Sequence, residues 1–530
     1  MLRPPEYALL YRKLPGWLRA LTIIVVLSYI TPPILLTLYL PGARTSILHR
    51  INLPWILEWT TLQALASATI AAVIGAPIGI AAAYYGSRIA RSYRVLGLPV
   101  FMAPSVAVIL GFRWLSGATG LASLAKAPMG IVVVHSYYNI PLAAVLAYSS
   151  LAGILGELVE YVETIGLRGV RLWRNLLIPA ALPGVASAWL LAFTYSFIGL
   201  AAPLMVEGAA YRYYTLEAWI YTIFSGFPEY TRIAAALSLA QAGLLAVLLF
   251  AILRASESRP RAPLEGPSLV RRRRSLPAMV LDAYSLIVLV YLYLPILGVF
   301  LESVTGPHGF TLQAYERLLH GNLPLPPGAG FTRALVNSLV YAGLTVVLAV
   351  LLSLPIAISR GVEQRLAGLA PLLFSPVTVG LALYLVLYRP LSLLAGGTLA
   401  TILLVVLAHT SAALPLASRA VDQALSRVTR EVMQFLAQLR LQGHELARHL
   451  LALARPGVVS AALLAAAASL GEFGATLVIT EPSTWSLGVL TYSLYSAGRL
   501  LPVASASASV LLAVSLAVSV LLSGKVREWF

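Results

Sequence analysis

The sequence contains no cysteine, which excludes disulfide bonds, thiolate metal sites and cysteine nucleophiles. Charge is also scarce: charged residues make up 11% of the 530 positions, whereas soluble domains carry roughly 25%. Acidic residues are the rarer kind, with 20 Asp and Glu against 37 Lys and Arg. Long stretches with almost no charge cannot all be buried in one water-soluble core, so the composition indicates a membrane protein.

Motifs for nucleotide binding and hydrolysis are missing as well. The sequence has no Gly-x-x-x-x-Gly-Lys-Ser/Thr loop, and its one Gly-Lys pair, Gly524-Lys525, is followed by Val526. His444 and His449 are five residues apart and would diverge by about 140° around a helix, so we expect no metal site there. No Ser/His/Asp arrangement is legible. We therefore expect no enzyme activity, no metal and no cofactor in this chain.

The hydrophobic residues, 59% of the chain, form apolar runs of the length that crosses a bilayer, about 20 residues. The first run is too long for a cleaved signal peptide and lacks a small-residue cleavage pattern. We expect an all-α polytopic protein with twelve transmembrane helices. The expected spans are 17–40, 58–85, 95–115, 128–150, 180–205 and 232–253, then 280–302, 332–358, 367–389, 396–418, 456–480 and 501–523.

The two sets of six spans carry the same landmarks in the same order, at offsets that drift only by loop-sized amounts. Two copies with matching topology indicate a pseudo-twofold axis normal to the membrane, with a pathway between the halves. This is typical of a transporter. The matching landmarks are Tyr29–Pro33 with Tyr291–Pro295, Pro77 with Pro355, Pro99 and Pro104 with Pro371 and Pro376, His135 and Pro141 with His409 and Pro415, and Gly166 and Pro179 with Gly443 and Pro456.

The formal charge of +17 is explained better by topology than by nucleic acid. Most Lys and Arg residues fall in segments that share one side if the N-terminus is cytoplasmic, as the positive-inside rule expects, and juxtamembrane arginines also meet anionic lipid. We therefore expect a multi-pass protein of the cell membrane, with both termini cytoplasmic. The expected organisation is an N-terminal arm (1–16), a first six-span domain (17–253), a Pro-rich and Arg-rich linker (254–277) and a second six-span domain (278–530).

The longest cytoplasmic segment of the first copy, 151–179, holds the sequence Glu160-Tyr-Val-Glu163-Thr-Ile-Gly166, with Pro179 thirteen residues beyond the glycine. It resembles the Glu-Ala-Ala…Gly…Leu-Pro loop of ABC-transporter permease subunits, in which this segment is a coupling helix that docks on the ATPase. A short helix that starts at the Glu, a turn at the Gly and a second helix that stops near a proline would suit that role. The alternative is a merely amphipathic interfacial helix.

The corresponding segment of the second copy, 419–455, keeps a glycine and a proline at the same step of thirteen, Gly443 and Pro456. It departs from the family pattern at the acidic position, because the residue six before Gly443 is Ala437. The resemblance therefore implies two ATPase contacts that need not be equal.

The resemblance extends over nearly the whole chain. Two six-span units in one polypeptide are similar to the fused permeases of ferric-iron and thiamine ABC importers, and the stretch 469–476 is similar to a segment of molybdate, sulfate and iron permeases. This implies tandem type I permease domains that alternate access, driven by two copies of an ATPase subunit. It also implies an extracytoplasmic solute-binding protein that docks near 41–57, 206–231, 303–331 and 481–500. Ferric iron or thiamine is the favoured solute, and molybdate, tungstate or sulfate stay open. The alternative function is a twelve-span secondary carrier of the major-facilitator type.

A few polar residues inside the spans are candidates for the solute pathway. Glu472 lies well inside an apolar span, and an intramembrane acid is a functional candidate by default. A structural role, in which Glu472 bonds to backbone or to a neighbouring hydroxyl, is the alternative. His135 and His409 occupy matching positions and would either line the axis or join helices. Weaker candidates of the same kind are Asn139, Tyr195 and Thr476.

Overall fold

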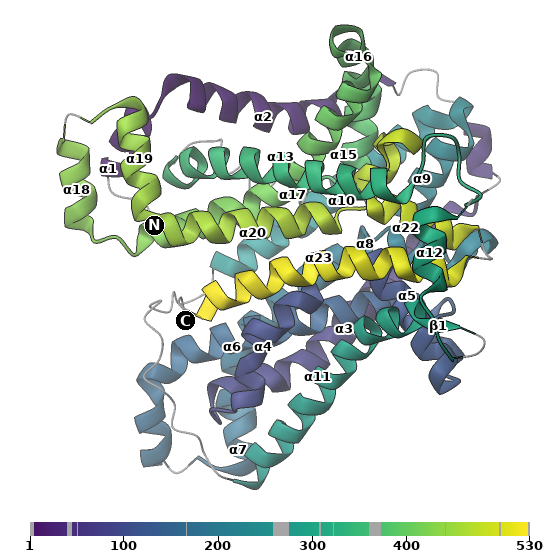
Figure 1. The fold of residues 1–530 in the computed structure, drawn as a ribbon. Helices are drawn as coiled ribbons and strands as arrows, with labels where there is room; N and C mark the ends of the chain where they lie inside the picture. Colours follow the sequence, from purple (N-terminus) through teal and green to yellow (C-terminus); the bar gives the residue numbers. More distant parts are fainter. Residues whose placement is uncertain are drawn as a thin grey trace. The chain divides into compact units, whose positions relative to one another are not determined.

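The computed structural model describes residues 5–39, 45–49, 51–165, 167–257, 275–306, 309–321, 323–359, 373–439, 441–497 and 500–527. The chain is an all-α polytopic membrane protein, as expected (Figure 1). Within the described part, ten helices are long and apolar enough to cross a membrane. Two further pairs of bent helices bring the number to as many as twelve.

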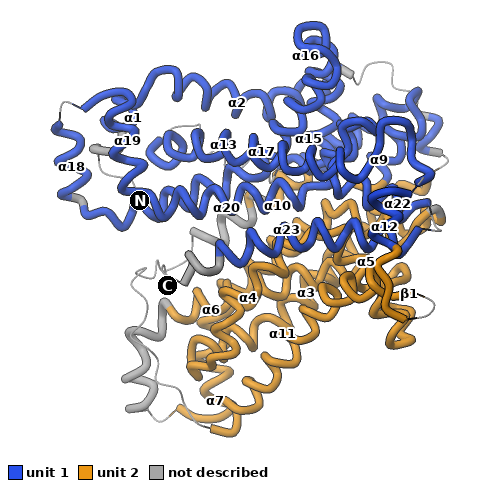
Figure 2. Tube along the Cα trace, viewed as in Figure 1, with its two compact units in different colours: residues 1–50, 219–243, 314–526 blue, residues 51–218, 244–313, 527–530 orange. Residues whose placement is uncertain are grey.

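The helices gather into two compact units that do not follow the order of the repeat (Figure 2). Unit 1 holds residues 1–50, 219–243 and 314–526, and unit 2 holds 51–218, 244–313 and 527–530. The first long helix of each copy thus belongs to the unit built mainly from the other copy. The two tandem domains, 17–253 and 278–530, stay a prediction about the repeat, and residues 258–274 of the linker between them lie outside the described residues.

Unit 2 is built around α3 and α6, which pack along each other and against α8. Helix α11, which is the first long helix of the second copy, packs on α4 and α5. The elements of this unit are α3 (Leu53–Ala83), α4 (Arg88–Phe101), α5 (Ser105–Thr119), η3 (Ala122–Leu124), α6 (Met129–Ile165), α7 (Gly169–Leu172), η4 (Trp173–Leu177), α8 (Ile178–Phe197), η5 (Pro203–Glu207), η6 (Gly208–Ala210), α11 (Leu276–Ser303), and the strands β1 (Thr305–Gly306) and β2 (Gly309–Phe310), which pair antiparallel.

Unit 1 is built around α13, α17 and α20, and α2 packs on it through Val25, Val26 and Tyr29. The boundary between the units falls inside α9 (Leu216–Gly226) and α10 (Thr231–Glu257). The other elements are α1 (Pro5–Lys13), α2 (Gly16–Leu35), η1 (Leu36–Tyr39), η2 (Thr45–His49), η7 (Pro228–Tyr230), α12 (Gln313–His320), α13 (Phe331–Ile358), α15 (Pro376–Leu383), η8 (Tyr384–Tyr388), α16 (Arg389–Ala395), α17 (Gly397–Ser426), α18 (Arg430–Gln438), α19 (Gly443–Leu453), α20 (Arg455–Gly471), α21 (Gly474–Ile479), η9 (Pro482–Thr484), α22 (Leu487–Ser496) and α23 (Leu501–Arg527).

The span expected at 95–115 is not one continuous helix. The chain breaks at 102–104, and α4 and α5 meet at an angle of 101°. Pro104 sits at the N-cap of α5 in an extended conformation, where its missing N–H costs nothing, and it cannot continue α4. Hydropathy alone joined the two pieces because both are apolar near the break.

Three other expected spans also need correction. The span 180–205 ends at Phe197 of α8, and Pro203 begins a separate π-helical turn. The span 367–389 is placed at 376–395, while residues 367–372 lie outside the described residues. The span 456–480 is interrupted after Gly471, where α20 ends and two non-helical residues precede α21. Where a helix is interrupted, backbone N–H and C=O groups lose the hydrogen-bond partners that a continuous helix would have given them.

Close helix packing in both units depends on glycine at one corresponding place. A Cβ on Gly184 of α8 would lie 2.2 Å from the Leu146 carbonyl oxygen of α6. A Cβ on Gly457 of α20 would lie 2.6 Å from the Ala420 carbonyl oxygen of α17. Small residues at such crossings let backbones approach, which is a common basis of helix association in membranes.

We predict that Gly184→Val lowers the thermal midpoint of the purified full chain, because the added side chain would overlap the backbone of α6. Overpacking of this kind costs roughly 1–3 kcal/mol. The matched control is Gly243→Val in α10, where a Cβ would meet nothing within 4 Å. Equal midpoints for the two variants would contradict the packing described here.

Candidate functional site

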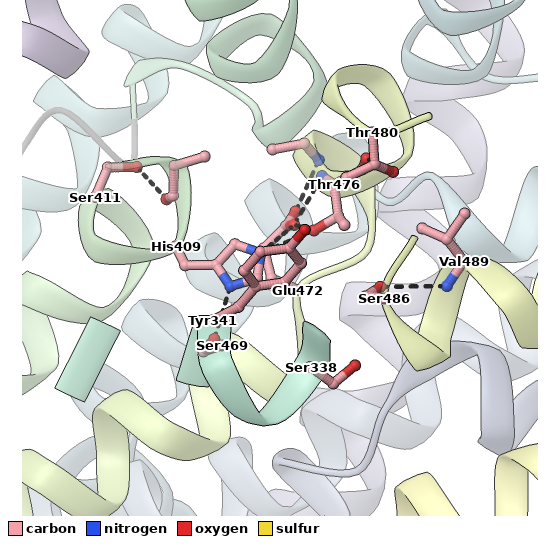
Figure 3. Close-up of polar contacts among 12 residues, drawn as sticks. Ser338, Tyr341, His409, Ser411, Ser469, Glu472, Thr476, Thr480, Ser486 and Val489 are labelled. Atoms are coloured by element: carbon pink, nitrogen blue, oxygen red, sulfur yellow. Dashed lines mark hydrogen bonds and ion pairs between the residues drawn. The ribbon is translucent and has the colours of Figure 1, made fainter. Parts of the chain in front are cut away.

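Glu472 lies at the break between α20 and α21, not inside a continuous span, which corrects the expectation from sequence. Its carboxylate accepts hydrogen bonds from the first turn of α21, the helix that follows it (Figure 3). The Ala475 N–H donates to one oxygen at 2.8 Å, and the Thr476 N–H donates to the other at 3.0 Å. The Thr476 hydroxyl also donates to that second oxygen, at 2.5 Å. The carboxylate therefore satisfies backbone donors that the break leaves without helical partners.

His409 of α17 completes this cluster. Its Nε2 lies 2.8 Å from the Thr476 hydroxyl and 3.3 Å from Glu472 Oε2. Because the single hydroxyl proton of Thr476 goes to Glu472, that hydroxyl accepts from His409, which places a proton on Nε2. The other ring nitrogen, Nδ1, lies 2.6 Å from the Ser469 hydroxyl on α20. His409 thus ties α17 to both sides of the break.

The matching histidine of the first copy has different partners. His135 Nδ1 lies 2.8 Å from the Gln63 Oε1 atom of α3, an acceptor, so Nδ1 carries the proton. Gln63 in turn donates to the Ser196 carbonyl oxygen at 2.8 Å. Asn139 donates to the His135 carbonyl oxygen at 2.8 Å, and its own buried Oδ1 has no hydrogen-bond partner within the described part of the chain. His135 therefore joins helices within unit 2.

The six pathway candidates are divided between the two units. Glu472, His409 and Thr476 meet in unit 1, while His135 and Asn139 lie one helical turn apart on α6 of unit 2. Tyr195 on α8 is 39% exposed, with its ring 6.3 Å from that of Phe101. The two residues that sequence reasoning missed are Ser469 and Gln63, the histidines' partners. Ser469 was visible only as part of the segment 469–476, and nothing in the sequence marked Gln63.

The two segments expected to be coupling loops, 151–179 and 419–455, are called the first and second elbow here, and they differ in the helix that leads into them. In the first copy α6 runs without a break to Ile165, so the short separate helix expected to start at Glu160 is not found. In the second copy α17 ends at Ser426, and the separate helix α18 follows. The side chains of Glu160 and Glu163 and the whole of Gly166 lie outside the described residues.

The glycine at which the chain turns within each elbow has the same backbone conformation in both copies. Gly169 has φ of +57° and Gly443 has φ of +59°, in the left-handed region that favours glycine. Each opens a helix after an extended residue, Arg168 with φ −140° and ψ 162°, and Gln442 with φ −143° and ψ 162°. The structural counterpart of Gly443 among the described residues is therefore Gly169, three residues beyond the glycine that the sequence pairing used.

This register explains a discrepancy in the spacing of the landmarks. Gly169 precedes Gly443 by 274 positions, the same offset that relates His135 to His409. Past the elbow, Gly184 precedes Gly457 by 273 positions. The extra residue of the first copy is taken up by the π-helical turn η4, since a π turn holds one residue more than an α turn. By this packing Pro183, not Pro179, matches Pro456, although Pro179 lies in the first turn of α8 as Pro456 does in α20.

No protein-family model matches the sequence. Curated relatives are permease proteins of transport systems. The chain is 25% identical over 168 residues to the spermidine/putrescine transport system permease protein PotC of Haemophilus influenzae, and 25% identical over 172 residues to that of Escherichia coli. It is 35% identical over 179 residues to the molybdenum transport system permease protein ModB of Mycobacterium tuberculosis. Each match covers 32% of this chain and 64% of the relative, less than two thirds of its length. The chain is thus a membrane protein similar to transport permeases.

We predict that Glu472→Gln destabilises the chain, because an amide group cannot accept the N–H and O–H bonds that both carboxylate oxygens now accept. A buried donor that loses its acceptor costs roughly 1–3 kcal/mol. The control is Glu229→Gln, the same change at an exposed position in η7. The measurement is the thermal midpoint of the full chain in detergent. A midpoint for Glu472→Gln that matches the control would overturn the structural role.

Proposed function

We propose that this chain is the permease of an ATP-driven ABC importer, moving a small solute into the cytoplasm by alternating access. The observation that carries the proposal is the pair of elbows, which turn at Gly169 and Gly443 with nearly the same backbone angles, between the predicted fourth and fifth spans of each copy. The similarity to permease proteins of transport systems supports the same class of function.

The second elbow offers a surface that suits a docking partner. Val432 and Phe435, one turn apart on α18, are 40% and 60% exposed, while Met433, Leu436 and Ala437 on the same helix are buried. A short helix that buries one apolar face and exposes another is suited to a groove on a soluble protein. We propose that this exposed face contacts an ATPase subunit.

We propose that a second copy of the ATPase contacts the first elbow. In the register given by Gly169, the residue six positions before the glycine is Glu163, and in the second copy it is Ala437. The acidic anchor of the family pattern would thus be Glu163, with Glu160, Gly166 and Pro179 flanking it, and the two ATPase contacts would be unequal. ATP-driven closure of the ATPase pair would rock the two copies and open the pathway first outward and then inward.

The remaining partners follow from the resemblance. We propose an extracytoplasmic binding protein that delivers solute to the loops 41–57, 206–231, 303–331 and 481–500. The proposed location is the cell membrane, with both termini cytoplasmic.

The solute is proposed from the resemblance to fused permeases, which favours ferric iron or thiamine over molybdate, tungstate or sulfate. The relatives belong to a spermidine/putrescine system and a molybdenum system, so they add weight to transport and not to one solute. The contacts of Glu472 favour a structural role, since both of its oxygens accept hydrogen bonds from the chain itself. A pathway role for Glu472 predicts that Glu472→Gln slows uptake even in protein that remains folded, and unchanged uptake and ATPase coupling would exclude that role.

The second candidate is a secondary carrier of the major-facilitator type, which also has twelve spans in two similar halves. Such carriers lack matched elbows between the fourth and fifth spans, so the paired turns at Gly169 and Gly443 count against it. Ion-driven uptake by the purified chain alone, in vesicles without any ATPase, would favour the carrier. Uptake that requires a co-purified ATPase and ATP would favour the importer.

We predict that Phe435→Ala weakens binding of the ATPase roughly tenfold or more, because an exposed aromatic ring at the centre of an interface commonly carries that much affinity. The measurement is the amount of nucleotide-hydrolysing subunit that co-purifies with the tagged full chain. Phe310→Ala is the control, since Phe310 is 79% exposed in a loop that we place on the opposite side of the membrane. If both variants retain the ATPase equally, α18 is not its docking surface.

A further inference from the structure

The N-terminal arm contacts the second elbow through specific polar bonds, although the two lie more than 400 residues apart in sequence. Helix α1 packs on α18. The Lys13 ammonium group donates to the Ala437 carbonyl oxygen at 2.7 Å and to the Leu439 carbonyl oxygen at 2.8 Å. The arm is therefore fastened to the point where α18 ends.

Lys13 meets α18 where a cation is most effective. The last carbonyl groups of a helix have no partner within the helix, and they form the negative end of its dipole. Helix α18 ends at Gln438, and Lys13 donates to the carbonyl oxygens of Ala437 and Leu439 at this end. One of the two carbonyls belongs to Ala437, the position at which the second copy lacks the acid that the first copy has at Glu163.

A second bond reaches the other side of the elbow turn. Trp17, in the first turn of α2, donates its indole N–H to His444 Nε2 at 3.0 Å. The two rings are also stacked, with centroids 5.9 Å apart and an interplanar angle of 29°. Because an indole nitrogen only donates, His444 Nε2 accepts and carries no proton in this contact. His444 directly follows Gly443, so Lys13 and Trp17 together hold the chain before and after the turn.

The arm has its own anchor in the apolar part of unit 1. Leu10, Leu14 and Leu18 recur every four residues and are at most 5% exposed. Leu10 lies on α1, Leu14 in the short link after it and Leu18 on α2, so burial holds both helices and the link. Lys13 and Trp17 thus project from a segment that burial already fixes in place.

We propose that Lys13 and Trp17 are positioning residues that brace the second elbow, so that the N-terminal arm holds in place a coupling segment that lacks its own acidic anchor. The effect of the brace on coupling to the ATPase rests on the proposed function, whereas the brace itself does not. A braced elbow would transmit a push from the ATPase to α19 and α20, whereas a loose elbow would absorb it.

The brace is tested on the full chain without ATPase or solute. The sequence lacks cysteine, so a single Gln438→Cys change on the exposed side of α18 gives one site for a spin label. We expect Lys13→Met to increase the mobility of that label, and amide exchange in residues 433–439 to become about tenfold faster, because a charge-assisted bond to two carbonyls is lost. Trp17→Phe should loosen residues 443–446 in the same way.

Arg12→Met is the matched control, because it removes a charge from an exposed position of the same arm. Lys13→Arg, which keeps the charge, should restore much of the protection. Unchanged exchange and label mobility in both Lys13→Met and Trp17→Phe would overturn the proposal, as would an equal effect of Arg12→Met. Exchange in α13, away from the elbow, reports whether each variant is folded.

The consequence for coupling is measured separately, in the complex with its ATPase. We expect Lys13→Met to keep the ATPase bound while uptake per ATP hydrolysed falls several-fold. A loosened elbow in a chain that binds no ATPase would uphold the brace and reject the importer function. A rigid elbow in a working importer would do the reverse.

Discussion

Every backbone N–H and C=O of this chain that leaves a helix in apolar surroundings must find a partner from the protein itself. Water is absent from the bilayer core, and each unsatisfied group there costs several kcal/mol. The chain nevertheless breaks its helices after Gly471 and before Pro104, deep in segments that hydropathy describes as continuous. Glu472 makes the first of these breaks tolerable, because its carboxylate accepts the N–H groups at the start of α21 and is itself held by His409 through Thr476.

The matching histidines of the two copies join helices through different partners. In the first copy, His135 hydrogen-bonds the side-chain amide of Gln63 on α3. In the second copy, His409 hydrogen-bonds hydroxyl groups on α20 and α21. One elbow is entered by the continuous helix α6 and the other by the separate helix α18. The repeat thus keeps its glycine turn while the contacts around the turn differ between the two copies.

The exchange of first helices links the two copies by topology. Helix α2 belongs to the unit built mainly from the second copy, and α11 belongs to the unit built mainly from the first. Neither copy, taken as a continuous stretch of sequence, is therefore a compact body. Residues near the N-terminus extend the same arrangement within unit 1, where Lys13 and Trp17 contact the second elbow. Side chains from the start of the chain thereby position a segment near its end.

The sequence by itself determined the fold class, the approximate spans and the order of the repeated landmarks, because hydropathy and the positions of Pro and Gly act over a few neighbouring residues. It also singled out Glu472, His409 and Thr476, which the fold brings into contact. Only the tertiary structure decided that Glu472 ends a helix, that Gly169 is the counterpart of Gly443, and that Lys13 caps α18. Lys13 bonds to residues more than 400 positions away, His409 reaches the break at Glu472 from another helix, and the register of Gly169 follows from one extra residue in a π turn. Patterns of hydropathy, Pro and Gly along the chain carry no record of these contacts.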